Sequence, residues 1–323
     1  MNIGLMTDAA CDLPSQFLQQ HNVEVLPINL RFGERSVLDI RDVNLTLEFY
    51  RSYMGNKDLE AETSPLTIEE TANFFRTLAP RYDKIICLVV AATRSKIFEN
   101  AANAAQAVGQ ELREARQAVN AAPVPNEQFG VRVIDTDSLF TGQGVLVYAA
   151  LRALQEGMSY SGLVSYIQEM VPKIHGYLVP QDLYYIRRRG RKRGDKSVSL
   201  MRYLVGNALD IKPIVEANRT QSQVAGKGRG FEETVQKVFN WASADIEAGL
   251  KLPAVVMSYG GNPKEITDTD AYKRFAEMAK PRGIKLLLSV MSPTAGIYVG
   301  PRSFSLAYAM DGYDNAFIRR AEE

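Results

Sequence analysis

The chain has 323 residues, of which 46% are apolar and 23% are charged, and this length and composition suit two α/β domains that share a cleft. Its 38 basic and 37 acidic residues leave a net charge of +1, which argues against general nucleic-acid binding because that function needs a basic field over a whole face. Two cysteines and two histidines, at these spacings, support neither a disulfide framework nor a zinc site.

In the first half of the chain, short apolar runs alternate with segments of helix-forming composition. Asp12 is the expected N-cap of the first helix, and Thr67 followed by Glu70 fits a capping box that starts a later one. Strands that alternate with helices in this way predict a doubly wound, mostly parallel sheet. We expect strands at residues 2–6, 23–32, 84–91 and 131–135, and helices at 14–21, 46–53, 68–79, 95–118 and 144–156.

The pattern loosens after residues 157–161, which form the candidate domain boundary. It predicts an N-terminal α/β domain of residues 1–158 and a smaller C-terminal α/β domain of residues 159–323, with a smaller sheet that has helices on one side. In this second half we expect strands at 174–179, 210–216, 221–226, 253–258, 284–290 and 304–309, and helices at 160–172, 180–188, 198–206, 231–248 and 267–280.

The strongest charge cluster is the basic run 187–196, which we expect to form a loop. Its seven cations suit contact with a phosphate, an anionic membrane surface or an acidic partner, and they equally suit a solvated loop.

We see no secretory signal, and the longest apolar stretch, 85–92, is too short to cross a bilayer. The two cysteines are expected to be reduced, although a pairing stays open because each is expected near a strand end. The sequence therefore predicts a cytoplasmic protein, and the short apolar stretch predicts that it does not span a membrane.

Small polar residues follow several predicted strands or precede predicted helices. They are Thr7-Asp8, Thr63-Ser64, Thr93 to Ser95, and residues 135–138. Hydroxyl and backbone N–H groups at strand ends and helix N-termini favour an anion, although each of these segments would also serve as an ordinary cap or turn. The carboxylates of Asp8 and Asp135 leave a second hypothesis open, a small-molecule enzyme that uses them as acid and base.

The sequence patterns of the common α/β enzymes are absent. No Gly-x-Gly-x-x-Gly turn follows the first strand, and neither a P-loop nor a Gly-x-Ser-x-Gly elbow occurs. Cys11 lies near a strand end without a histidine partner in view, so we interpret it as a packed thiol and not as a nucleophile.

The chain opens with the segment Thr-Asp-x-x-x-Asp-Leu-Pro at 7–14. Further distinctive segments follow at Thr63-Ser64, 85–101, 133–144, 183–191, 207–214, 228–230 and 293–301. Taken in this order, these motifs resemble the DegV family, whose members bind a fatty acid. The resemblance covers roughly residues 1–309 and implies two α/β domains with a ligand tunnel between them.

The resemblance also assigns residues to a ligand site. Thr63 and Ser95 match the two groups that hold the fatty-acid carboxylate, and Arg229 matches an arginine behind it. Tyr298 stands where the family has a histidine, so it is able to donate a hydrogen bond but carries no positive charge near neutral pH. Arg191 matches an arginine at the cleft edge that is implicated in handing the acyl group to a kinase partner.

The function implied by the resemblance is that of a lipid carrier, which would itself catalyse nothing. The chain would bind a long-chain fatty acid and present its carboxylate to a fatty acid kinase subunit, where the chemistry would take place. Burial of about fifteen methylenes at about 0.8 kcal/mol each would exceed the contribution of the head group, so the tunnel is expected to select the acyl chain. No metal or cofactor is expected besides the bound acid, and a transient contact with a membrane surface stays open.

Overall fold

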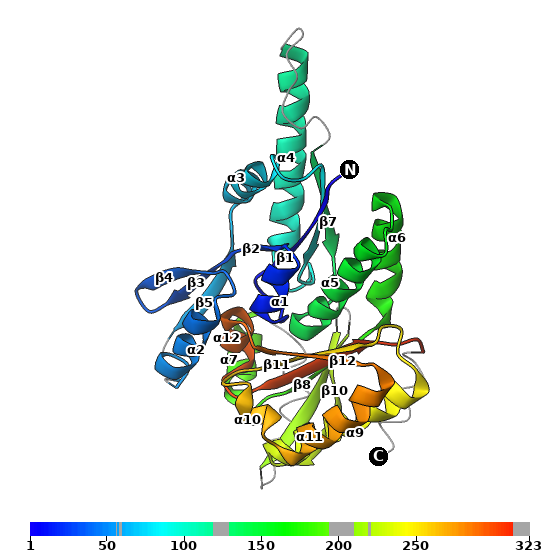
Figure 1. The fold of residues 1–323 in the computed structure, drawn as a ribbon. Helices are drawn as coiled ribbons and strands as arrows, with labels where there is room; N and C mark the ends of the chain where they lie inside the picture. The colour runs from blue at the N-terminus through cyan, green and yellow to red at the C-terminus, as the bar shows by residue number, and fades with distance from the viewer. Residues whose placement is uncertain (56, 58–59, 119–128, 194–209, 219–220, 313–323) are drawn as a thin grey trace.

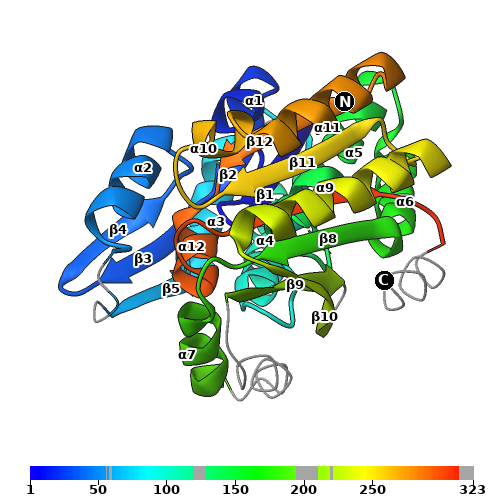
Figure 2. The same ribbon diagram turned by 90° about the horizontal axis from the view of Figure 1, so that it is seen from below.

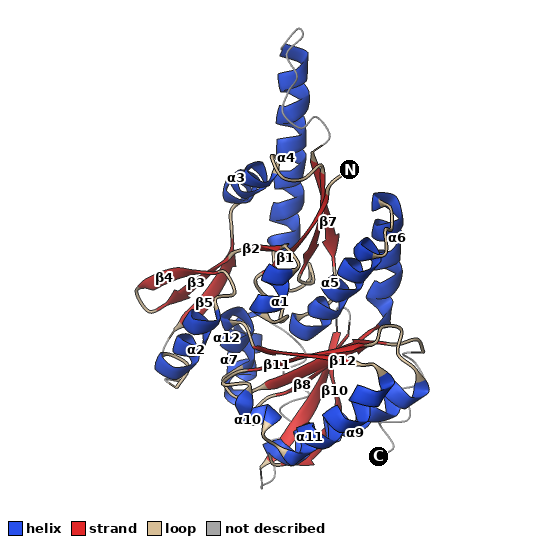
Figure 3. Ribbon diagram, viewed as in Figure 1, coloured by secondary structure: helices blue, strands red, loops and turns tan. Residues whose placement is uncertain are grey.

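The computed structural model describes residues 1–55, 57, 60–118, 129–193, 210–218 and 221–312. Within these residues the strands form three sheets, which can be followed along the chain in Figure 1 and by type of secondary structure in Figure 3. One sheet is parallel, one is small and antiparallel, and one is mixed. The position of each relative to the others decides where a ligand site is built.

The first sheet has four parallel strands in the order β2-β1-β6-β7. Helices cover both of its faces. Neighbouring residues of β1 point to opposite sides of the sheet, so Leu5 packs with the core around α5 and Met6 packs with α3 and α4. The predicted doubly wound parallel sheet is therefore confirmed. The bounds are β1 Ile3–Asp8, β2 Val23–Leu26, β6 Lys84–Val89, β7 Gly130–Asp135, α1 Ser15–Gln20, α3 Ile68–Leu78, α4 Ile97–Ala118, α5 Phe140–Gln155 and α6 Tyr160–Met170.

The single strand expected at 23–32 is in fact two strands in different sheets. Pro27 separates them, since a proline has no N–H to donate to a continuing ladder. After it the chain enters an antiparallel sheet of order β4-β3-β5, and we predicted neither of its outer strands, β4 and β5. The bounds are β3 Ile28–Phe32, β4 Arg35–Asp39 and β5 Ala61–Pro65, and the helix α2 that follows β4 covers Val43–Ser52.

These three strands and α2 form a unit that projects from the side of the molecule in Figure 1, and we call it the arm. The turn predicted at Gly33 is present between β3 and β4, where the glycine has a φ of +57°. Phe49 of α2 packs on Phe32 of β3, with ring centroids 5.9 Å apart. That contact fixes the helix against one face of the arm's sheet.

The second half of the chain builds a mixed sheet of six strands in the order β10-β9-β8-β13-β11-β12, in which β11 and β12 are parallel. This sheet is not the smaller one we expected, since the parallel sheet has four strands. Figure 2 shows α9 and α11 over its outer face. The bounds are β8 Ile174–Val179, β9 Ile211–Asn218, β10 Gln221–Arg229, β11 Ala254–Tyr259, β12 Lys285–Val290, β13 Phe304–Ala309, α9 Phe231–Ala248 and α11 Asp270–Ala279.

Helix α5 lies between the two large sheets and packs on both. Its buried residues share one hydrophobic core with Leu5 and Leu88 of the parallel sheet and with Val256 and Ala307 of the mixed sheet. A helix that packs on both sides has little exposed surface, and twelve of the sixteen residues of α5 are buried. The predicted domain boundary falls at the turn that follows this helix, and it stays a prediction.

Two further expectations need correction. Asp12 does not cap α1, whose N-cap is Pro14 without a side-chain hydrogen bond. The basic run is helical over residues 187–193, because α7 (Leu183–Arg193) continues past the predicted end of its helix, and the helix expected at 198–206 lies outside the described residues. Two helices were not predicted, α10 (Lys264–Thr267) and α12 (Pro293–Val299), and short 3₁₀ turns occur at Val171–Lys173 and Lys280–Arg282.

Candidate functional site

Two of the predicted site residues meet directly. Thr63 lies on β5 and Tyr298 on α12, and their hydroxyl oxygens are 2.9 Å apart. The residues are 235 positions apart in the chain, so only the fold brings them together. Both residues are half-buried.

An apolar cluster lies beside this hydroxyl pair, between the arm and the mixed sheet, and we call it the arm cluster. It joins buried residues of β3, α2 and β5 with others from β8, β9, β12 and α12, and Tyr298 packs against it. Its buried members are Leu30, Phe32, Phe49, Tyr50, Met54, Ala61, Leu178, Val215, Val290, Met291, Ala295, Ile297 and Val299. A polar pair at the edge of an apolar region is the arrangement that an amphipathic ligand requires.

The position of α12 depends on close packing by two tyrosines. A Cβ atom on Gly296 would lie 2.3 Å from the Tyr50 hydroxyl, so only glycine lets α2 approach the helix this closely. The same Tyr50 hydroxyl donates a hydrogen bond to the Ser292 carbonyl, at 3.2 Å. Gly300 ends α12 with a φ of +91°, and Tyr185 of α7 fills the space where its side chain would be.

Ser95 lies just before α4, and its hydroxyl accepts a hydrogen bond from the Ile97 N–H at 3.3 Å. No contact within the described part of the chain joins it to Thr63. One turn further, the Asn100 side chain donates to the Leu66 carbonyl at 2.7 Å, which ties the start of α4 to the segment that follows Thr63. We did not single out Asn100 from the sequence, because an amide in a helix has no distinctive pattern.

The two predicted arginines lie in different elements. Arg229 is the last residue of β10, where it is exposed and paired with Ile211 of β9. Among the described contacts none links it to Thr63 or to Tyr298. Arg191 falls within α7, which packs against α12. The helix that contains most of the basic run is thus the neighbour of the helix that carries Tyr298.

Contacts from α7 also hold the loop that leads into β5. Arg188 donates to the Lys57 carbonyl at 2.6 Å, and Lys57 in turn forms an ion pair with Asp182. The Tyr185 hydroxyl donates to the Met54 carbonyl at 2.8 Å. These contacts attach α7 to the connection between α2 and β5, the strand that carries Thr63.

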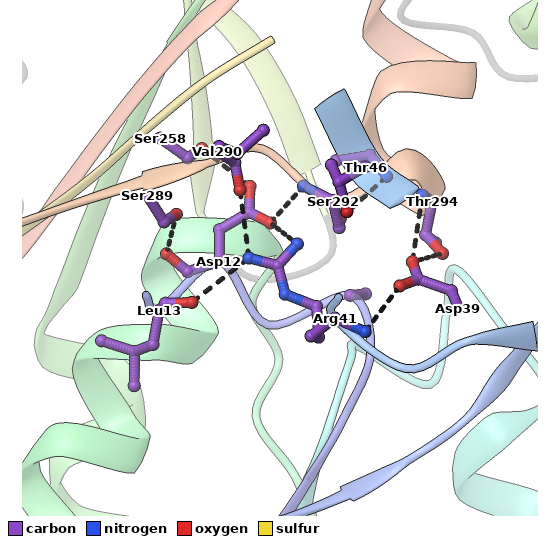
Figure 4. Close-up of polar contacts among 12 residues, drawn as sticks. Asp12, Leu13, Asp39, Arg41, Thr46, Ser258, Ser289, Val290, Ser292 and Thr294 are labelled. Carbon is purple, nitrogen blue, oxygen red and sulfur yellow. Dashed lines mark hydrogen bonds and ion pairs between the residues drawn. The ribbon is translucent and has the colours of Figure 1, made fainter. Parts of the chain in front are cut away.

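A buried polar cluster, which the sequence analysis missed, lies at the start of α12 and is drawn in Figure 4. Asp12, Asp39 and Arg41 are each less than 5% exposed, and Arg41 Nη1 is 3.5 Å from Asp12 Oδ1. Burial raises the pKa of both carboxyl groups, and the Arg41 guanidinium opposes that rise. Arg41 has a left-handed backbone with a φ of +63°, a feature that no simple sequence pattern predicts.

The two cysteines are free and fully buried, in different hydrophobic cores. Burial raises the pKa of Cys11 to about 12, so the thiolate that a nucleophile needs is scarce near neutral pH. The interpretation of Cys11 as a packed thiol therefore agrees with its surroundings. In the described residues, no group of three or more histidine, cysteine, aspartate or glutamate side chains is arranged to hold a metal ion.

Comparison with known proteins decides the family. A family model described as "Uncharacterised protein, DegV family" matches residues 2–311. A DegV domain-containing protein of Xanthomonas axonopodis pv. citri is 36% identical over 312 residues, which is 96% of this chain and 98% of that protein. A second relative, from Xanthomonas campestris pv. campestris, has the same identity and coverage. This chain belongs to the DegV family. The resemblance seen in the ordered motifs is confirmed.

Solved DegV structures share the fold of this DegV chain. A stearic-acid-binding protein from Eubacterium ventriosum superposes with a TM-score of 0.77 at 19% identity, covering 95% of this chain and 98% of that one. DegV of Bacillus subtilis, described as a fatty-acid-binding protein, gives 0.72 at 19% identity, with 96% and 100% covered. A fatty-acid-binding DegV protein from Thermus thermophilus gives 0.71 at 20%, with the same coverage. These likenesses confirm the predicted α/β fold class.

Asp8 and Asp135, which the alternative enzyme hypothesis uses as acid and base, hold loops in this DegV chain. Asp8 is fully buried, and its two oxygens accept hydrogen bonds from the N–H groups of Val90 and Ala10, at 2.6 and 2.8 Å. Asp135 accepts from the N–H groups of Ala92 and Asp137, at 3.1 and 2.8 Å. Each carboxylate therefore already has backbone partners at the strand ends.

In the described part of the chain no helix has the length and apolar character needed to cross a membrane.

Proposed function

We propose that this chain binds a long-chain fatty acid, with the carboxylate at Thr63 and Tyr298 and the acyl chain in the arm cluster. The observation that carries the proposal is the contact of 2.9 Å between the two hydroxyl groups at the edge of a large apolar cluster. Several structural neighbours are described as fatty-acid-binding proteins, which supports the same ligand class.

The two hydroxyl groups suit a carboxylate because each has one proton to donate. In this structure one of them donates to the other, and a bound carboxylate would accept from both. Neither hydroxyl group can carry a positive charge, so the head group would be held by hydrogen bonds without an ion pair from these two residues. Ser95 and Arg229 are further head-group candidates by their match to the family.

The acyl chain supplies most of the binding free energy in this proposal. Each methylene moved from water into the arm cluster contributes about 0.8 kcal/mol, whereas a hydrogen bond to a charged group contributes about 1.5–3 kcal/mol. Affinity for saturated acids should therefore rise steeply with chain length until the apolar space is filled. The hydroxyl pair would fix the orientation of the acid.

The proposal extends to a partner. A cytoplasmic fatty acid kinase subunit would phosphorylate the bound carboxylate, so the chemistry would reside in that partner and this chain would act as a carrier. The packing of α7 against α12 supports a partner-facing role for Arg191, since the basic helix adjoins the helix of Tyr298. The free buried cysteines suit a reducing compartment.

Native mass spectrometry of the purified protein, followed by extraction and lipid analysis, tests ligand binding. We expect one fatty acid per chain, or uptake of added palmitate. Replacement Thr63→Ala removes one hydrogen bond to the carboxylate and should weaken palmitate binding about 10- to 100-fold. Ser64→Ala is the matched control, because Ser64 is exposed and its side chain points to the opposite face of β5.

Two results would contradict the proposal. A protein that neither retains a fatty acid nor takes up palmitate would exclude the ligand class. A Thr63→Ala variant that binds palmitate as tightly as the Ser64→Ala variant would exclude the hydroxyl pair as the head-group site. Phosphorylation of bound palmitate by a purified kinase subunit, measured with and without Arg191→Ala, tests the partner separately.

A further inference from the structure

Two side chains of helix α12, one helical turn apart, are hydrogen-bonded to strands of the arm. Thr294 and Tyr298 are four positions apart, so they lie on the same face of the helix. The Thr294 hydroxyl donates to Asp39 Oδ2 of β4 at 2.9 Å, and the Tyr298 hydroxyl lies 2.9 Å from that of Thr63 on β5. A movement of the helix that separates the first pair would therefore displace the second.

Asp39 is itself held firmly. It is 3% exposed, and its other oxygen accepts from the Arg41 N–H at 3.1 Å. The Arg41 guanidinium donates to the carbonyls of Leu13 and Val290, at 3.2 and 3.1 Å, which belong to the loop after β1 and the end of β12. Figure 4 shows these contacts converging on the start of α12.

Asp12 fixes the same helix end from the other side. It accepts from the Ser292 N–H at 2.8 Å and from the Ser258 hydroxyl at 2.7 Å. Ser292 is the N-cap of α12, and its own hydroxyl accepts from the Ala295 N–H at 3.1 Å. The first turn of α12 is thus attached both to the arm and to the strands of the mixed sheet.

From this geometry we propose that Asp39 and Thr294 are positioning residues for the head-group site: their hydrogen bond sets where the Tyr298 hydroxyl lies relative to Thr63. The proposal rests on the proposed function, since it explains how the acid's hydroxyl partners are held ready. It goes beyond the hydroxyl pair because it assigns a role to Asp39 and Thr294, which act on that pair through the position of α12.

Replacement Thr294→Val tests this directly, because valine keeps the shape of threonine and loses the hydroxyl. Thr46→Val is the matched control: Thr46 is 3% exposed on the arm, and its hydroxyl donates at 2.6 Å to the Asp42 carbonyl of its own helix. We expect Thr294→Val to weaken palmitate binding about tenfold, the effect of one lost hydrogen bond. Thr294→Ser should bind like the wild type, and Thr46→Val should leave binding unchanged.

A double-mutant cycle separates positioning from simple loss of stability. If Thr294 acts through Tyr298, Thr294→Val should cost little further affinity in a Tyr298→Phe background. If the two effects on palmitate binding add in full, or if Thr46→Val weakens binding as much as Thr294→Val, the positioning role is overturned.

A measurement without ligand keeps this inference distinct from the proposed function. With 3-fluorotyrosine at position 298, the fluorine resonance reports the environment of the hydroxyl in the free protein. We expect Thr294→Val and Thr63→Ala to shift this resonance and Thr46→Val to leave it in place. An unshifted resonance in Thr294→Val overturns the positioning role even if palmitate binds, whereas a shifted resonance with no palmitate binding upholds it and overturns only the fatty-acid site.

Discussion

At the scale of single residues, the buried Asp8 carboxylate holds two loops by hydrogen bonds, and its burial disfavours its charged form. Its two backbone hydrogen bonds hold the segments that follow β1 and β6. Burial raises the pKa of Asp8 to about 6, because the charged form loses its water. The folded state therefore keeps this proton up to a higher pH than the unfolded chain, in which the aspartate pKa is about 3.9.

This shift predicts the sign of a pH dependence. Between about pH 4 and pH 6 the folded state binds more protons than the unfolded state, so the contribution of Asp8 to the free energy of unfolding falls as pH rises, by up to about 3 kcal/mol. Asp8→Asn does not titrate, and its stability relative to the wild type should improve over that range in urea unfolding. Glu70→Gln should show the opposite trend below about pH 5, since hydrogen bonds from Thr67 lower the pKa of Glu70 beneath its unfolded-state value and the wild type loses that stability as the pH falls. A flat difference for Asp8→Asn between pH 4 and pH 7 would contradict this account.

Tyr298 leads to a second prediction at this scale. Tyrosine donates a hydrogen bond but is not a cation, whereas histidine becomes one below its pKa of about 6.5. In Tyr298→His we expect palmitate affinity to increase about tenfold between pH 8 and pH 5.5, relative to the wild type over the same range. Tyr298→Phe serves as the control, and fluorescence displacement measures all three proteins. Parallel pH profiles for Tyr298→His and Tyr298→Phe would show that the ring does not face the carboxylate.

At the scale of elements, local signals in the sequence predicted those features that depend on neighbouring residues. The capping box of Thr67 and Glu70 is present at the start of α3. The turn at Gly33 is present as well. By contrast, α12 was missed because it is short, and its position depends on Tyr50 and Tyr185, which are distant in the chain.

The packing of α12 on α2 leads to a prediction about Gly296. In Gly296→Ala the new Cβ would lie 2.3 Å from the Tyr50 hydroxyl, so we expect a loss of about 1–3 kcal/mol in the free energy of unfolding. The loss should be smaller in a Tyr50→Leu background, where the clashing atoms are absent. Chemical denaturation of the four proteins measures the coupling, and an equal cost in both backgrounds would show that the contact is not the cause.

At the scale of the whole molecule, α5 joins the two large sheets in one hydrophobic core. Two domains predicted from the sequence need not unfold separately when a buried helix belongs to the packing of both. We therefore expect a single cooperative unfolding transition.

Trp241, the only tryptophan, tests this because it lies in the core between the mixed sheet and α9. Phe75 lies on the far side of the parallel sheet, in the core with α3 and α4. Phe75→Ala should cost about 3–5 kcal/mol and shift the midpoint seen by Trp241 fluorescence together with that seen by circular dichroism. A Trp241 midpoint that stays in place while the circular dichroism midpoint moves would show two independent units.

The sequence by itself determined the doubly wound parallel sheet and the positions of most helices and strands, because these depend on apolar periodicity and local caps. The order of its motifs identified the family, and the match of those motifs to the family singled out Thr63 and Tyr298. Only the tertiary structure decided that their hydroxyl groups meet, that residues 23–32 divide between two sheets, and that Asp12 contacts Ser292 and Arg41. The physical reason is that a contact between residues far apart in the chain depends on how the elements pack, and no local pattern contains that information.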